Sequence, residues 1–138
     1  MFYSHFILLA RRGKRYQITV CRHGIVHLMW RNASIQLRIA NFDRLAVVLE
    51  RGKSLNSSIP LCEGDFCVAI EDRAYRVSMG SFELVLSAEE YLTLSDMALE
   101  AAHQLARVLA SDDWQAPEPT ERPAGPLEGL YPHHFSLN

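Results

Sequence analysis

The chain contains the same short pattern twice, and this duplication restricts its fold more than any other feature of the sequence. The first copy runs from Ile25 to Leu49 (IVHLMWRNASIQLRIANFDRLAVVL) and the second from Ala74 to Leu99 (AYRVSMGSFELVLSAEEYLTLSDMAL). In each copy, apolar residues first alternate and then recur every three or four positions. This change of period indicates a strand that leads into an amphipathic helix. Because one strand pair and one helix cannot bury an apolar face alone, we expect the two copies to pack together.

The two copies can be aligned residue by residue. The strand residues align 47 positions apart, with Ile35, Leu37 and Ile39 matching Phe82, Leu84 and Leu86. After a two-residue insertion, the helix residues Phe42, Leu45 and Val48 match Tyr91, Leu94 and Met97. We therefore predict an α+β fold, in which two pseudo-repeated units of antiparallel strands plus a helix form one domain over residues 1–110.

The first unit covers residues 1–52 and the second residues 61–110, with a linker at 53–60. Turn residues and alternating patterns predict strands at 2–10, 16–22, 25–30, 34–39, 66–71, 75–79 and 82–86, with a brief pairing at 61–62. Helices are expected at 42–51 and 88–110. Residues 111–138 carry five prolines between Pro117 and Pro132, so we expect an extended or disordered arm there.

Capping signals place the ends of both helices. Asn41 is a suitable N-cap for the first helix, and Gly52 is a suitable C-terminal stop. Ser87 and Glu90 have the spacing of a capping box at the start of the second helix.

The net charge of −2 conceals an opposite charge on the two halves of the chain. Residues 1–53 hold ten Lys/Arg against two Asp/Glu, a net +8, and residues 54–138 hold four against fourteen, a net −10. Two interpretations remain open. Either the halves attract one another, within a chain or across a dimer, or the first half forms a basic face that receives an acidic partner.

Cysteine and histidine residues offer one candidate metal site. Cys21, His23 and His27 would share a face on an unbroken strand, and thiolate with imidazole suits zinc or copper. His23 precedes Gly24 in a predicted turn, which breaks that alignment, so we assign no metal ligands. The spacing of Cys62 and Cys67 fits no zinc or redox motif, and we expect two reduced thiols in a cytoplasmic protein.

Catalytic motifs are missing from the sequence. There is no G-x-S-x-G elbow, no P-loop and no G-x-G-x-x-G that opens a helix, so a non-enzymatic role without a cofactor is favoured. Nucleic-acid binding by the basic half is an alternative, but the acidic second half and a pI near 6.3 count against it. No apolar run reaches the ~20 residues that span a bilayer.

Two segments resemble known families. The opening MFYSHFILLARRG resembles the amino terminus of cohesin kleisin subunits, but the similarity ends after a dozen residues and we attribute no function to it. The pattern C-x-x-G-x-x-H-L-x-W from Cys21 to Trp30, followed by N-x-x-I-x-L to Leu37, is similar to small bacterial accessory proteins. Some of these accompany pathways that modify ribosomally made peptides. The resemblance implies peptide binding without catalysis, and it identifies no binding residue.

We therefore predict a non-catalytic peptide- or protein-binding accessory module that presents a precursor peptide to modifying enzymes. The nucleic-acid binder and the small Cys21/His23/His27 metal protein are the alternatives. An exposed edge strand can accept an extended peptide, and arginines beside it would select acidic side chains. The candidate partner-binding residues are Trp30, Arg31, Arg38 and Arg44. The same edges could instead join two subunits, so we also expect a homodimer.

Overall fold

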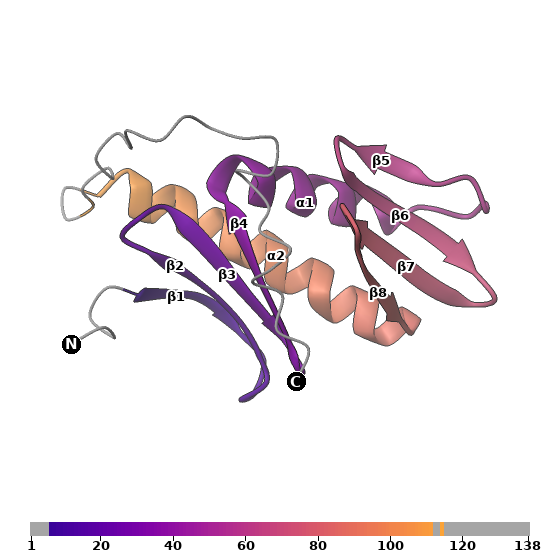
Figure 1. Ribbon diagram of the computed structural model, residues 1–138, viewed down its shortest axis with the longest axis horizontal. Helices are drawn as coiled ribbons and strands as arrows, with labels where there is room; N and C mark the ends of the chain where they lie inside the picture. The colour runs from indigo at the N-terminus through magenta and orange to yellow at the C-terminus, as the bar shows by residue number, and fades with distance from the viewer. Residues whose placement is uncertain (1–5, 112–113, 115–138) are drawn as a thin grey trace.

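The computed structural model describes residues 6–111 and residue 114, and this part of the chain forms two four-stranded sheets and two helices (Figure 1). The first antiparallel sheet has the order β1 (Phe6–Arg11), β2 (Tyr16–Cys21), β3 (Ile25–Trp30), β4 (Ala33–Arg38), and α1 (Ile39–Gly52) follows it. The second has the order β5 (Leu61–Glu63), β6 (Phe66–Glu71), β7 (Ala74–Met79), β8 (Phe82–Leu86), and α2 (Ala88–Leu109) follows it. The predicted α+β fold of two strand-plus-helix units is confirmed.

Each unit buries its alternating residues in the way the pattern predicts. On β3, Val26, Leu28 and Trp30 are buried while the residues between them are half-buried. On β7, Val77 and Met79 are fully buried. One continuous apolar cluster contains the buried residues of both sheets and both helices.

The strand pairing corrects the predicted alignment of the two units. Trp30 pairs with Ala33 across the β3–β4 turn, and Met79 pairs with Phe82 across the β7–β8 turn, so the two hairpins correspond at a separation of 49 residues (30 to 79 and 33 to 82). The helices begin at Ile39 and Ala88, at the same separation, so there is no two-residue insertion. The pattern could not reveal this, because a shift of two residues along a strand leaves every side chain on its original face.

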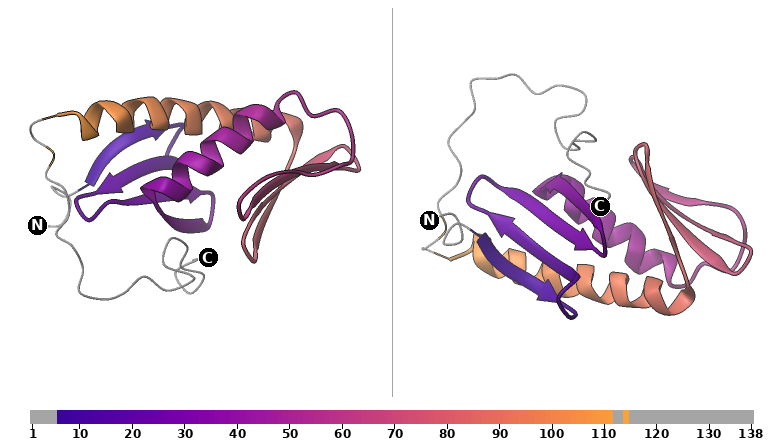
Figure 2. Two further views of the ribbon diagram at one scale, coloured as in Figure 1. Left: turned by 90° about the horizontal axis from the view of Figure 1, so that it is seen from above. Right: turned by 60° about the horizontal axis from the view of Figure 1, so that its bottom comes forward.

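The two units are interlocked through their helices. Helix α1 contacts β5 and β6 of the second sheet more extensively than any strand of its own sheet, and α2 likewise contacts β1 and β2 of the first. Figure 2 shows the consequence: α2 runs along the molecule past both sheets, while α1 crosses beside it. Each helix therefore covers an apolar face that the other unit supplies.

Both ends of α1 differ from the prediction. The helix starts at Ile39, directly after the extended residue Arg38, which makes no side-chain cap; Asn41 lies inside the first turn. Ile39 continues both the strand alternation and the helical stripe, so the pattern left the boundary ambiguous. At the other end Gly52 is the last helical residue, and Lys53 still has right-handed dihedrals (φ −60°, ψ −28°). Gly52 therefore does not act as a left-handed C-terminal stop.

The start of α2 follows the sequence closely. Ser87 accepts a hydrogen bond from the Glu90 backbone N–H, and the Glu90 carboxylate accepts one from the Ser87 N–H at 2.8 Å, so the capping box is confirmed. The buried stripe contains Tyr91, Leu94, Ala98 and Ala101. Of the predicted proline-rich arm at 111–138, only residues 111 and 114 belong to the described chain.

Candidate functional site

The four residues predicted to bind a partner do not form one site. Trp30 is only 3% exposed and belongs to the core, where its ring meets that of Tyr16 edge to face at 4.7 Å. Arg31 is exposed, forms an ion pair with Glu90 on α2, and donates a hydrogen bond from Nε to the Tyr16 hydroxyl at 3.2 Å. Trp30 is thus a packing residue, whereas Arg31 lies on the surface at the β3–β4 turn.

The other two arginines lie elsewhere. Arg38 pairs with Ile25, at the end of the six-residue strand β4 that is opposite to Trp30. A strand of that length spans roughly 20 Å. Arg44 is exposed on α1 beside the β5–β6 turn, where its Cδ would lie 3.6 Å from a Cβ added at Gly64. Arg31, Arg38 and Arg44 therefore mark three separate places on the surface.

Much of the opposite charge on the two halves is paired within the chain. Cations of the first half meet carboxylates of the second half in four ion pairs: Arg12–Glu100, Arg31–Glu90, Arg51–Glu63 and Lys53–Asp96. Such exposed pairs each contribute at most ~1 kcal/mol to stability. Because each pair joins a cation of the first half to a carboxylate of the second, the pairs support the interpretation that the halves attract one another within one molecule.

The edge strand β1 carries an unusual run of exposed apolar side chains. Phe6, Ile7 and Leu8 are 43%, 37% and 49% exposed, although they follow one another along a single strand. Ile7 pairs with Val20, whose side chain is completely buried, so the Ile7 side chain lies on the core face of the sheet. The Ile7 side chain is nevertheless open to solvent. Both faces of the first half of β1 are therefore incompletely covered. Within the described residues, no strand pairs with its outer edge.

A basic turn continues from this strand. Residues 11–15 are all exposed and include Arg11, Arg12, Lys14 and Arg15. Arg31 lies at the same end of the sheet, because its N–H donates to the carbonyl of Arg15 at 2.9 Å. Arg12 and Arg31 have carboxylate partners on α2, whereas no ion pair of Arg11, Lys14 or Arg15 occurs among the described residues. We call residues 6–8 the apolar edge and Arg11, Lys14 and Arg15 the cationic turn.

Sequence reasoning identified this strand but missed its significance. The run FILLARRGKR contains five successive apolar residues without alternation, followed by a cluster of cations. Such a run fits a fully buried central strand equally well. Only the sheet order shows that β1 is an edge.

The outer face of the first sheet carries His27 beside the apolar edge. Its ring meets Phe6 at 5.1 Å, its Nε2 atom is buried without a hydrogen-bond partner, and burial lowers the pKa of the imidazole. Cys21 is a buried free thiol, and His23 lies in the β2–β3 turn as predicted. Across the described ranges, no three His, Cys, Asp or Glu residues come together in a way that could hold a metal ion.

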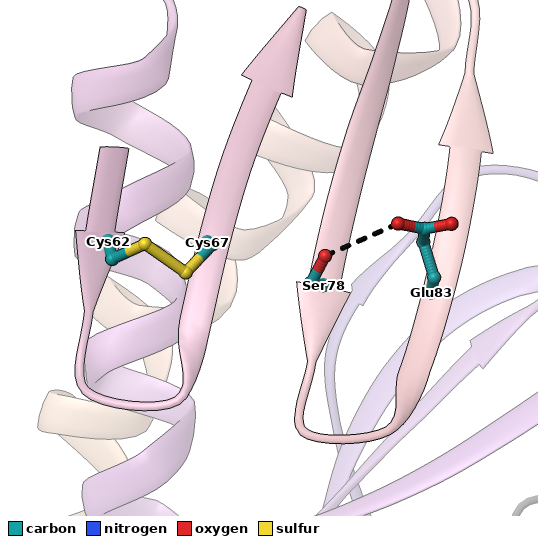
Figure 3. The surroundings of a disulfide bond; sticks show 4 residues. All are labelled: Cys62, Cys67, Ser78 and Glu83. Carbon is teal, nitrogen blue, oxygen red and sulfur yellow. Dashed lines mark hydrogen bonds between the residues drawn. A yellow bond between two sulfur atoms is a disulfide. The ribbon is translucent and has the colours of Figure 1, made fainter. Parts of the chain in front are cut away.

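The prediction of two reduced thiols in the second unit is wrong. Cys62 on β5 and Cys67 on β6 form a disulfide, with their Cα atoms 4.1 Å apart (Figure 3). The two residues are direct partners in the strand register, so strand pairing alone brings their sulfur atoms together. The sequence spacing of the two cysteines did not predict the disulfide, because it fits no known motif. The two cysteines face one another because the hairpin that carries them has a two-residue turn. Ser78 and Glu83 continue the same row across the sheet, with a hydrogen bond from Ser78 Oγ at 3.4 Å.

A small pocket lies between the end of the first sheet and the start of α2. Its volume is about 240 Å³ and its lining residues are Arg12, Tyr16, Trp30, Glu89, Glu90 and Thr93. Arg12 and Glu90 are already paired with Glu100 and Arg31. The Thr93 hydroxyl donates to the Glu89 carbonyl within the helix. The arrangement brings together no nucleophile with an adjacent base, so it suggests no reaction.

Neither helix in the described residues is long and apolar enough to cross a membrane. Comparisons of the chain with known protein families, with curated proteins and with solved structures found no match.

Proposed function

We propose that this protein is a non-catalytic binding module that holds an extended segment of a partner protein as an additional strand along β1. The observation that carries the proposal is the exposure of three successive apolar side chains, Phe6, Ile7 and Leu8, on a strand whose outer edge is unpaired within the described chain. Main-chain hydrogen bonds along such an edge provide affinity, and the side chains beside it provide selectivity.

The shape of the edge supports this mode of binding. A protected edge strand usually carries charges or proline along its length, which discourages strand addition. Here a bulge between Leu8 and Ala10 and the first cation, Arg11, come only in the second half of β1. The first half is regular and apolar, so a docked strand would cover side chains on both faces.

Of the three arginines proposed from the sequence, Arg31 lies at the end of the sheet where the cationic turn is found. Arg38 lies on β4, at the opposite edge of the sheet from β1, and Arg44 lies on α1 beside the β5–β6 turn. The finer proposal, presentation of a precursor peptide to modifying enzymes in the cytoplasm, rests on the resemblance of the first unit to accessory proteins. It predicts that a modifying enzyme processes its precursor faster when this protein is present.

A peptide library tests the binding mode directly. Displayed random 12-residue peptides would be selected on the wild-type protein and counter-selected on the variant Phe6→Asp/Leu8→Asp. Selected peptides should bind the wild type in calorimetry and slow hydrogen exchange at the amides of β1. Enrichment of no peptide, or protection confined to other strands, would contradict the proposal.

The homodimer expected from the sequence would compete for the same edge. Sedimentation of the wild type and of Phe6→Asp/Leu8→Asp separates the two cases. A dimer that dissociates in the variant would mean that a second copy, and not a peptide, occupies β1. The nucleic-acid alternative stays a prediction; it requires affinity for any single-stranded oligonucleotide that falls steeply with salt.

A further inference from the structure

We infer that the segment received by β1 combines an apolar stretch of about four or five residues with acidic residues next to it. This inference rests on the proposed function and specifies the partner's chemistry. The apolar edge would contact the apolar stretch, and the cationic turn formed by Arg11, Lys14 and Arg15 would contact the carboxylates.

The length of the partner segment follows from the geometry of β1. Strand β1 comprises six residues from Phe6 to Arg11, which corresponds to roughly 20 Å. An extended peptide advances by the same rise per residue, so a single segment reaches from the apolar edge to the cationic turn. An added strand places its alternate side chains on the two sheet faces. One set would meet Phe6 and Leu8, and the other would meet Ile7.

The acidic residues expected in the partner segment follow from the cations at the end of β1 that have no carboxylate partner among the described residues. The carboxylates of Glu90 and Glu100 are already engaged by Arg31 and Arg12. Among the described residues, the Arg11 guanidinium reaches only the carbonyl of Gly13, at 3.0 Å, and Arg15 reaches only the side-chain carbonyl of Asn32, at 3.1 Å. Neutral acceptors leave these two positive charges uncompensated, so a carboxylate brought close to them gains charge-assisted hydrogen bonds.

Arg11 also connects the two parts of the surface. It pairs with Gln17 in the register, on the same outer face as Leu8, which pairs with Thr19. A docked strand with an acidic side chain on that face would thus meet Arg11 directly after it passes Leu8. A neighbouring apolar side chain on the same face would meet Phe6, whose ring already contacts that of His27 on β3 at 5.1 Å.

The closing experiment uses three synthetic peptides with one apolar core, Val-Ile-Val-Ile-Val. The core is flanked on both sides by three Asp/Glu, three Asn/Gln or three Lys residues, so that strand direction does not affect the comparison. Binding to the full chain would be measured by calorimetry at low salt and again at ~0.5 M salt, where the Debye length falls to about 4 Å.

The acidic peptide should bind on the order of tenfold more tightly than the neutral one at low salt, because three exposed ion pairs add to the affinity. High salt should remove that difference. The variant Arg11→Glu/Lys14→Glu/Arg15→Glu should reverse the order, with the lysine-flanked peptide binding best. The matched control Arg44→Glu/Arg51→Glu/Arg73→Glu changes the net charge equally at exposed sites on α1 and in the β6–β7 turn, and it should preserve the order.

The possible failures can be told apart. Equal affinity for the acidic and neutral peptides, with β1 amides still protected from exchange, would overturn the acidic preference and leave strand addition standing. Loss of the preference in the matched control as well would show that net charge, and not the cationic turn, is responsible. Absence of binding by all three peptides, while β1 is buried in a dimer, would overturn both proposals.

Discussion

The strongest stability prediction concerns the place where the end of α1 meets α2. A Cβ added at Gly52 would lie 2.2 Å from the hydroxyl oxygen of Tyr91, far inside van der Waals contact. Tyr91 cannot move away easily, because it is fully buried, its ring is stacked on Tyr75 at 4.2 Å, and its hydroxyl donates a 2.5 Å hydrogen bond to the carbonyl of Leu49. The variant Gly52→Ala must therefore displace the hydroxyl.

The cost can be assembled from three contributions. Overpacking in a dense core costs about 1–3 kcal/mol, and a buried hydroxyl separated from its acceptor costs about 1–3 kcal/mol. Replacement of a helical glycine by alanine returns at most about 1 kcal/mol, and less at the last residue of a helix. We expect Gly52→Ala to lower the free energy of unfolding by about 2–4 kcal/mol, a large part of the 5–15 kcal/mol typical of a domain.

A double-mutant cycle isolates the cause. In a Tyr91→Phe background the clashing oxygen is absent, and the nearest remaining atoms are Val68 Cγ1 at 3.1 Å and Tyr91 Cζ at 3.3 Å. Shifts of a few tenths of an ångström relieve those contacts, so Gly52→Ala should then cost about 1 kcal/mol or less. Urea unfolding of the wild type, both single variants and the double variant gives the coupling energy. If the two substitutions are additive within about 0.5 kcal/mol, the argument from the hydroxyl is refuted.

The pseudo-repeat supports the same reasoning. At the separation of 49 residues, the counterparts of Gly52 and Tyr91 are Ala101 and Phe42, and both are completely buried. The counterpart positions thus combine an alanine with a ring that lacks a hydroxyl. The glycine occurs only where the hydroxyl occurs.

Three further outcomes can be measured on the same protein. Ser87→Ala should cost about 1 kcal/mol, because it removes the acceptor that the Glu90 N–H uses at 3.1 Å; urea unfolding would show it, and no change would contradict a capping role. Removal of the disulfide by Cys62→Ser/Cys67→Ser should lower the unfolding free energy by about 2 kcal/mol, since the closed loop is short; a loss above ~4 kcal/mol would mean that β5 depends on it for pairing. Because burial lowers the pKa of His27, its neutral form is favoured in the folded state, and the stability that this provides is present above pH ~6.5 and is lost as the pH falls. The unfolding free energy of the wild type relative to His27→Gln should therefore fall from pH 7.5 to pH 5. A constant difference would show that the pKa of His27 is not lowered by burial.

The local order of this protein could be predicted from periodicity and capping alone. The alternation in β2, β3 and β6–β8 and the apolar stripe with the capping box of α2 each reflect interactions between residues close in sequence, so they are visible without coordinates. The duplication also predicted two similar units. It could not specify their register, because a strand slipped by two residues presents the same faces.

Long-range packing determined the features that matter most for function. Which helix covers which sheet, which strands become edges, and which cysteines face one another depend on contacts between residues 5 to 88 positions apart. Trp30 therefore lies inside the core, where the pattern suggested a binding residue, while Phe6 to Leu8 remain exposed, where the pattern suggested an ordinary strand. Burial depends on the sum of all neighbours around a side chain, and a linear pattern records only those along the same segment.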